Sequence, residues 1–168
     1  MSKAMHVIFL SGPIGSGKTT LGRGLAEQLS AGFIDGDDFS DSDQPWYCSI
    51  HRTSKGIVAA ALAMFDVCKV VVIAYPLGCV NWIYFRRKFL EFGVDSVFVS
   101  LKASYEAIVD ESRGRIFTPE EKMRIRTMIA EGYDQRPFSD LVWHTDRERL
   151  SETLRGLGAE IREILPAD

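Results

Sequence analysis

A glycine-rich segment near the amino end carries the residue types that hold a polyphosphate. Residues 12–20 read GPIGSGKTT and fit the pattern G-x-x-x-x-G-K-[ST] through Gly12, Gly17, Lys18 and Thr19. Glycines let the backbone wrap closely round an anion, because no side chain blocks the approach of main-chain N–H groups. The pattern therefore predicts a phosphate-binding loop for a nucleoside triphosphate.

The side chains of this loop have separate expected roles. Lys18 is predicted to reach the terminal phosphates, and the Thr19 hydroxyl to ligate the Mg²⁺ that accompanies ATP. A helix is expected to begin at about Lys18, so that its free N–H groups and positive dipole end face the same anion. The residues expected to bind the nucleotide are Gly12, Ile14, Gly15, Ser16, Gly17, Lys18, Thr19 and Thr20.

A second candidate site is the acidic turn at 35–38, DGDD, which follows a short apolar run at 31–34. Ligands bind at the carboxyl ends of parallel strands, so this turn is expected beside the phosphate loop. Asp35 is a candidate to hold Mg²⁺ through water, and Asp37 to accept the proton of an attacking hydroxyl. A solvated acidic turn without a role is the alternative.

Five apolar runs separated by helical patterns must position these residues. The expected strands are 6–10, 31–34, 69–74, 94–101 and 141–144. Strands that alternate with helices predict a three-layer α/β/α sandwich with a five-stranded parallel sheet and right-handed crossovers. The third strand ends in Tyr75 with no acid beside it, which leaves Asp35 as the sheet's carboxylate for Mg²⁺.

Helices are expected over 49–66, from 81 to 92 and from Ser104 to about Ser112. A final helix is expected to serve packing alone, with one apolar stripe formed by Leu150, Leu154, Leu157, Ile161 and Leu165.

Two arginines lie in a glycine-containing bend. Arg113 and Arg115 precede residues 118–121, TPEE, which form a capping box with proline at the first helical position. Such a bend suits a mobile lid at about 112–125, whose arginines would close on the transferred phosphoryl group. Surface salt bridges are the alternative role for both arginines.

Other basic residues are weaker candidates for an anionic acceptor. Arg52 lies beside His51 on the second helix, where a solvated pair is the alternative. Arg136 precedes the last strand and is expected either to bind an anion or to cap the preceding helix. The run at 86–88, RRK, also fits an exposed basic helix face.

The phosphate loop followed by residues 33–38, FIDGDD, resembles the P-loop small-metabolite kinases of the gluconate kinase and shikimate kinase group. Residues 41–46 resemble the acidic Pro-Trp segment of gluconate kinases, and residues 133–146 the closing segment of shikimate kinases. The resemblance implies sheet order 2-3-1-4-5 and lid arginines at 113 and 115. It also places the turn after Thr145 near the adenine.

The length and composition of the chain restrict the kind of protein it can be and the partners it can have. A chain of 168 residues, 46% hydrophobic, is expected to form one domain over 1–168. A net charge of −3 predicts no nucleic-acid partner. Cys48, Cys68 and Cys79 form no C-x-x-C pair, which indicates free thiols in a reducing compartment. No apolar run is long enough to span a bilayer, so we expect a cytoplasmic protein without a membrane partner. The oligomeric state stays open.

These features predict an ATP- and Mg²⁺-dependent phosphotransferase acting on a hydroxyl of a small metabolite, such as a sugar acid or a shikimate-like compound. Lys18, Arg113 and Arg115 are expected to stabilise the transferring group. Asp37 would act as the base and bind the acceptor, together with Arg52 and Arg136. The alternatives are a nucleoside, nucleotide, adenylylsulfate or antibiotic kinase, or an ATP-binding or ATP-hydrolysing module without an acceptor. A guanine switch is disfavoured, because the only asparagine, Asn81, lies in no N-K-x-D motif.

Overall fold

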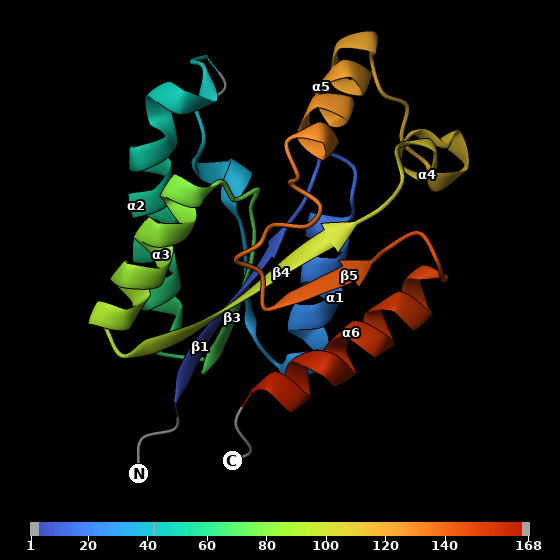
Figure 1. Cartoon of the computed structure of the whole chain (residues 1–168). Coiled ribbons are helices and arrows are strands. Elements are labelled where there is room, and N and C mark those ends of the chain that lie inside the picture. The colour runs from blue at the N-terminus through green and yellow to red at the C-terminus, as the bar shows by residue number, and fades with distance from the viewer. Residues whose placement is uncertain (1–3, 42, 166–168) are drawn as a thin grey trace.

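The computed structural model describes residues 4–41 and 43–165, and a five-stranded parallel sheet forms its centre (Figure 1). The strands are β1 (Met5–Ser11), β2 (Gly32–Asp35), β3 (Val70–Ala74), β4 (Val94–Lys102) and β5 (Leu141–His144). Their spatial order is β2-β3-β1-β4-β5, and every neighbouring pair is parallel. The predicted fold class and sheet order are confirmed.

Helices cover both faces of this sheet, as predicted. They are α1 (Lys18–Leu29), α2 (Trp46–Met64), α3 (Cys79–Glu91), α4 (Tyr105–Val109), α5 (Pro119–Ala130) and α6 (Leu150–Ile164), with the short 3-10 helices η1 (Gly36–Phe39) and η2 (Glu111–Arg113). Figure 1 shows α2 and α3 on one face and α1 and α6 on the other. The helices α4 and α5 lie beyond the carboxyl edge of the sheet, at the top of that view.

The two helix layers bury opposite sides of β1. Val7 and Phe9 belong to the core under α2 and α3, whereas Ile8 and Leu10 belong to the core under α1 and α6. All four side chains are fully buried. A strand that is apolar on both faces must lie in the interior of a covered parallel sheet. The loop that follows β1 is therefore held at the middle of the carboxyl edge.

Several helix boundaries differ from the sequence prediction by a few residues; α2, for example, ends at Met64 rather than at 66, and α3 begins at Cys79 rather than at 81. The helix expected to run to about Ser112 ends at Val109, because Asp110 is extended (φ −64°, ψ 115°). Its Oδ1 accepts the Ser112 N–H at 2.9 Å and starts η2. Aspartate often competes in this way with helix hydrogen bonds. The second helix begins at Trp46, three residues before the expected start at Ser49.

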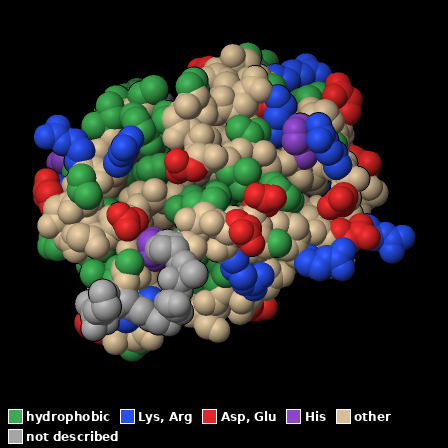
Figure 2. All heavy atoms as spheres, turned by 60° about the horizontal axis from the view of Figure 1, so that its bottom comes forward, with side chains coloured by type: hydrophobic (Ala, Val, Ile, Leu, Met, Phe, Trp, Pro, Cys, Tyr) green, Lys and Arg blue, Asp and Glu red, His purple; other side chains and the backbone are tan. Residues whose placement is uncertain are grey.

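The amino edge of the sheet carries mixed charge. Figure 2 shows this side, where Lys and Arg side chains are interspersed with Asp and Glu among the residues drawn in colour. Within the described ranges, every helix is too short or too polar to cross a membrane.

Candidate active site

A cavity of about 820 Å³ opens at the carboxyl edge of the sheet. Its floor is the phosphate loop and the start of α1, residues 14–21. One wall comes from residues 107–121 and carries Arg113 and Arg115, and another comes from the turn between β5 and α6. Asp37 lines the cavity as well. The fold thus brings together the loop, the acidic turn and both lid arginines that the sequence singled out.

Glycines shape the phosphate loop for close approach. Gly15 (φ +75°) and Gly17 (φ +98°) adopt left-handed conformations that favour glycine, and Gly17 is the N-cap of α1. A Cβ at Gly12 would lie 2.6 Å from Ser16 Oγ and 2.9 Å from the Leu101 carbonyl oxygen. The loop therefore packs against β4 at Gly12, while the amino end of α1 faces the cavity, as anion binding requires.

Lys18 folds back over its own loop. Its Nζ donates to the carbonyl oxygens of Gly12 at 3.0 Å and Pro13 at 2.8 Å. Burial lowers the pKa of Lys18 from 10.5 to about 8, although the charges of Asp37 and Asp35 oppose this shift. The ammonium group therefore lies at the loop, bound to carbonyls that phosphate oxygens would replace.

Thr19 and Asp35 place two side-chain oxygens next to each other beside the loop. Thr19 Oγ1 donates to Asp35 Oδ2 at 2.9 Å, and Asp35 Oδ1 accepts the Asp37 N–H at 3.2 Å. Mg²⁺ prefers hard oxygen donors and usually takes only one or two from the protein, the others coming from phosphates and water. Among the described residues no cluster of three or more His, Cys, Asp and Glu side chains forms a metal cage. The Thr19–Asp35 pair fits a magnesium ion shared with a nucleotide.

Asp37 is exposed at the cavity wall with a perturbed carboxyl group. Partial desolvation raises the pKa of Asp37, and the negative charge of Asp35 raises it further, whereas Lys18 opposes the shift. A carboxylate with a raised pKa is a stronger base than an ordinary aspartate. The turn that carries Asp37 packs on the Tyr75 ring, since a Cβ at Gly36 would lie 2.7 Å from Tyr75 Cγ.

Arg113 and Arg115 contact residues that are close to them in the sequence. Arg113 Nη1 donates to the Ala107 carbonyl at 3.2 Å. Arg115 Nη2 pairs with Glu121 Oε1 at 2.9 Å, and its guanidinium lies 4.5 Å from the Phe117 ring centroid. Between the two arginines, Gly114 has φ +82°. Both side chains line the cavity. Their present contacts are exposed to solvent, so breaking them to bind a ligand would cost little free energy.

Residues of α4 and of the segment before α5 pack directly on the phosphate loop. A Cβ at Gly15 would lie 2.7 Å from Phe117 Cζ and 2.8 Å from Ile108 Cγ2. The predicted capping box at the start of α5 is confirmed, because Thr118 Oγ1 accepts the Glu121 N–H at 3.2 Å and Glu121 Oε2 accepts the Thr118 N–H at 2.9 Å. The lid helix therefore starts at a defined residue above the loop.

Arg52 and Arg136 lie outside the lining of this cavity. Arg52 pairs with Asp41 at 3.0 Å, and its side chain is 69% exposed. Arg136 donates through Nε to the Leu77 carbonyl at 3.0 Å and through Nη1 to the Glu131 carbonyl at 2.8 Å. Glu131 is the C-cap of α5, so Arg136 has the helix-capping contact that was its alternative role. Acceptor binding by either arginine stays a prediction.

Sequence reasoning missed part of the cavity wall. The first turn of α6 contributes Leu150 and Thr153, although the helix was expected only to pack. Leu157 and Ile161 are fully buried as predicted, but Leu150 is 54% exposed. The position of α6 in the chain could have predicted this role, because a helix that follows the carboxyl end of a parallel strand begins at the edge of the sheet where ligands bind.

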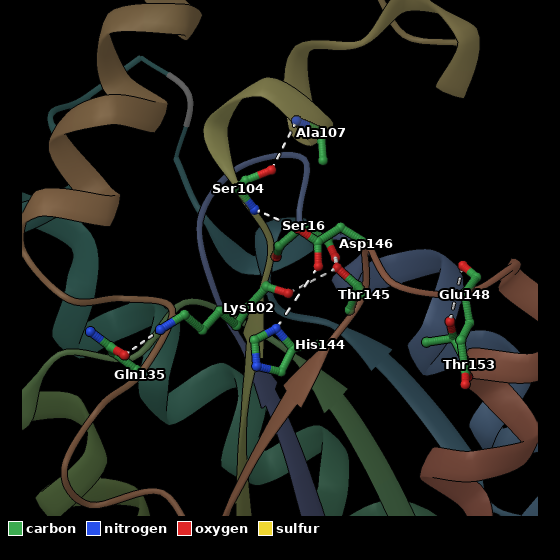
Figure 3. Close-up of polar contacts among 10 residues, drawn as sticks. All are labelled: Ser16, Lys102, Ser104, Ala107, Gln135, His144, Thr145, Asp146, Glu148 and Thr153. Atoms are coloured by element: carbon green, nitrogen blue, oxygen red, sulfur yellow. Dashed lines mark hydrogen bonds and ion pairs between the residues drawn. The ribbon is translucent and has the colours of Figure 1, made fainter.

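The turn after β5 is hydrogen-bonded to both the phosphate loop and the start of α4 (Figure 3). Thr145 Oγ1 donates to the Ser16 carbonyl at 3.0 Å. Asp146 Oδ2 accepts the main-chain N–H of Ser104, the N-cap of α4, at 2.8 Å. Two adjacent residues therefore join the three segments that enclose the cavity.

Short segments of the chain match curated shikimate kinases. The protein from Psychrobacter cryohalolentis is 48% identical over 42 residues, 25% of this chain and 23% of that protein. The protein from Francisella tularensis subsp. novicida is 61% identical over 31 residues, 18% of each chain. The matched stretches thus span less than a quarter of these relatives. No protein-family model matches the chain.

Solved structures match nearly the whole chain at low identity. A gluconokinase from Sinorhizobium meliloti 1021 has a TM-score of 0.68 and 21% identity, with 98% of this chain and 95% of that chain covered. A sugar kinase from Janibacter sp. HTCC2649 has a TM-score of 0.70 and 17% identity over 98% and 99%. A shikimate kinase from Acinetobacter baumannii in complex with shikimate has a TM-score of 0.54 and 22% identity over 96% and 93%. These matches show a shared fold.

Proposed function

We propose that the protein is an ATP-dependent kinase that transfers the γ-phosphoryl group to a hydroxyl of a small metabolite. The observation that carries this proposal is the convergence of Lys18, Asp37, Arg113 and Arg115 on one cavity whose floor is the phosphate loop. A binding module needs the loop alone. Phosphoryl transfer also requires a general base and cationic side chains that can reach the transferred group, and all of these line this one cavity.

The nucleotide would bind with its phosphates against the main-chain N–H groups of the loop and the amino end of α1. Lys18 Nζ would leave the Gly12 and Pro13 carbonyls and donate to the terminal phosphates. Thr19 and Asp35 would hold the Mg²⁺ that accompanies ATP, which neutralises charge on the phosphate oxygens when bound.

Asp37 would act on the acceptor. Its carboxylate takes the proton of the attacking hydroxyl while the hydroxyl oxygen bonds to the γ-phosphorus. The bond from that phosphorus to the β–γ bridging oxygen breaks, and ADP leaves with the electron pair. Arg113 and Arg115 would swing from the Ala107 carbonyl and Glu121 onto the phosphoryl oxygens, where they stabilise the developing charge. The lid at about 112–125 is expected to move for this exchange.

The acceptor is proposed to be a sugar acid or a shikimate-like compound. The names of the structural matches, gluconokinase, sugar kinase and shikimate kinase with shikimate, support this class. Arg136 is a candidate partner for an acceptor carboxylate, since its guanidinium is held in place by two carbonyls and by the Tyr133 ring, 3.9 Å from Arg136 Cζ.

The test combines an acceptor screen with one matched variant. Sugar acids, shikimate, neutral sugars, nucleosides and adenylylsulfate are screened by thermal shift with a nonhydrolysable ATP analogue, since a true acceptor stabilises the complex. Hits are then assayed for acceptor-dependent ADP release. Asp37→Asn is expected to slow transfer by about 10²–10⁴-fold and to leave affinity for the analogue within a few-fold of wild type.

Two results would contradict the proposal in different ways. Slow ATP hydrolysis that none of the compounds accelerates would indicate a binding or hydrolysing module. An Asp37→Asn variant that transfers within a few-fold of the wild-type rate would be compatible with a kinase but would show that Asp37 is not the general base. A nucleoside or adenylylsulfate as the best acceptor would overturn the acceptor class.

A further inference from the structure

The end of β5 contacts the phosphate loop across 129 positions of sequence. Thr145 Oγ1 donates to the Ser16 carbonyl oxygen at 3.0 Å, and both residues are buried (Figure 3). Thr145 is itself fixed, because its main-chain N–H donates to the Lys102 carbonyl of β4 at 2.9 Å. The Ser16 carbonyl is therefore held by a donor anchored in the sheet.

This hydrogen bond orients the peptide that joins Ser16 to Gly17. The peptide is trans and planar, so its C=O and N–H point in opposite directions. With the Ser16 oxygen directed at Thr145, the Gly17 N–H points away from Thr145. Gly17 lines the cavity and is the N-cap of α1, where an anion is expected to bind.

Main-chain hydrogen bonds hold the groups on either side of this peptide. The Ser16 N–H donates to the Pro13 carbonyl at 3.2 Å and the Gly17 carbonyl accepts the Leu21 N–H at 2.8 Å, but neither bond involves the Ser16 carbonyl. Gly15 and Gly17 flank Ser16, and glycine permits wide rotation of the backbone. The Ser16 hydroxyl has no hydrogen-bond partner among the described residues, so it does not restrain the peptide. The Thr145 hydroxyl is thus the restraint supplied from outside the loop, and its loss would leave a buried carbonyl unpaired.

We propose that Thr145 is a positioning residue for the phosphate loop. Its hydroxyl directs the Gly17 N–H toward the phosphate groups of the ligand and holds it there before binding. The inference rests on the proposed nucleotide site and is independent of the acceptor and of the transfer step. Thr145 begins the turn that is expected to lie near the adenine. We nevertheless expect its hydroxyl to affect the binding of the phosphate groups and not that of the adenine.

The test separates phosphate binding from base binding by calorimetry with tripolyphosphate, ADP and adenosine. Thr145→Val removes the hydroxyl at nearly constant shape, and Thr145→Ser keeps it. The valine variant is expected to bind tripolyphosphate and ADP about five- to tenfold more weakly, the effect of one lost hydrogen bond, and adenosine within about twofold of wild type. The serine variant is expected to bind all three within about twofold of wild type.

Thr53→Val is the matched control. It removes another buried threonine hydroxyl, which donates to the Phe39 carbonyl at 3.1 Å and lies outside the lining of the cavity. Its affinity for tripolyphosphate is expected to equal that of wild type. A similar loss in this variant would show that the removal of any buried threonine hydroxyl disturbs the loop, and would overturn the specific role of Thr145.

Other outcomes decide the proposal directly. A folded Thr145→Val variant with wild-type affinity for tripolyphosphate overturns it, and so does an equal loss for adenosine and ADP. If the valine variant does not fold, Thr145→Cys replaces it, because a thiol is a weak donor of similar size and an intermediate loss is expected. A wild-type protein that binds none of the three probes contradicts the proposed function, whereas normal binding by wild type and valine variant alike contradicts this inference alone.

Discussion

The position of Lys18 predicts that nucleotide affinity depends on pH. In the free protein, burial lowers the pKa of Lys18 to about 8, because desolvation of the ammonium outweighs attraction by Asp37 and Asp35. A bound triphosphate brings several negative charges to the ammonium and raises its pKa toward the ordinary value. Binding therefore takes up a proton wherever the free lysine is neutral. Affinity should be nearly complete at pH 7 and below, and should fall as the pH rises through 8.

The magnitude follows from that pKa. With a value of about 8, the free Lys18 is about nine-tenths protonated at pH 7, one-half at pH 8 and one-tenth at pH 9. If only the charged lysine binds the triphosphate, the apparent Kd rises about tenfold between pH 7 and pH 9, or about 1.4 kcal/mol. Proton uptake at pH 8 should be about half a proton per nucleotide bound.

Calorimetry with a nonhydrolysable ATP analogue measures both quantities. Titrations in two buffers of different ionisation enthalpy give the proton uptake, and a series from pH 7 to pH 9 gives the affinity slope. Lys18→Arg is the control, because a guanidinium stays charged throughout this range. Its affinity should not vary with pH, whatever its absolute value. A flat wild-type profile would refute the reasoning, and an equal slope in the arginine variant would assign the titration to another group.

Two further predictions concern the lid and the acidic turn. Arg115→Ala is expected to slow transfer by about 100- to 1,000-fold, as loss of a charge-stabilising donor does. Arg126→Ala removes an arginine of α5 that lies over the Tyr105 ring and outside the lining of the cavity, and should be near wild type in the same assay. Equal rates for the two variants would argue against a role for Arg115. Gly36→Ala would place its Cβ 2.8 Å from Tyr75 Cβ and is expected to lower the free energy of unfolding by about 1–3 kcal/mol, measured by urea denaturation. Gly78→Ala, whose Cβ would have no neighbour nearer than 3.8 Å, should cost only the smaller loss of about 0.5–1 kcal/mol expected when alanine replaces an N-cap glycine, and a similar loss in both variants would show that the Tyr75 contact is not the cause.

Much of the fold could be predicted because it depends on local patterns. The central strand β1 is apolar on both faces, which identifies a covered parallel strand without any tertiary information. Thr118 and Glu121 satisfy the capping box within four residues. The sheet order, by contrast, came from resemblance to a family, since the same strands can be ordered in more than one way.

The sequence by itself determined which residues form the phosphate loop, because its glycines, Lys18 and Thr19 act within one short segment. Only the tertiary structure decided which distant side chains meet that loop. Arg136 supports a helix end and Leu150 faces the cavity, although their residue types suit other roles equally well. Thr145 reaches Ser16 only because β4 and β5 pair in one register and end at the same edge. Contacts of this kind depend on strand register and packing, which no local pattern encodes.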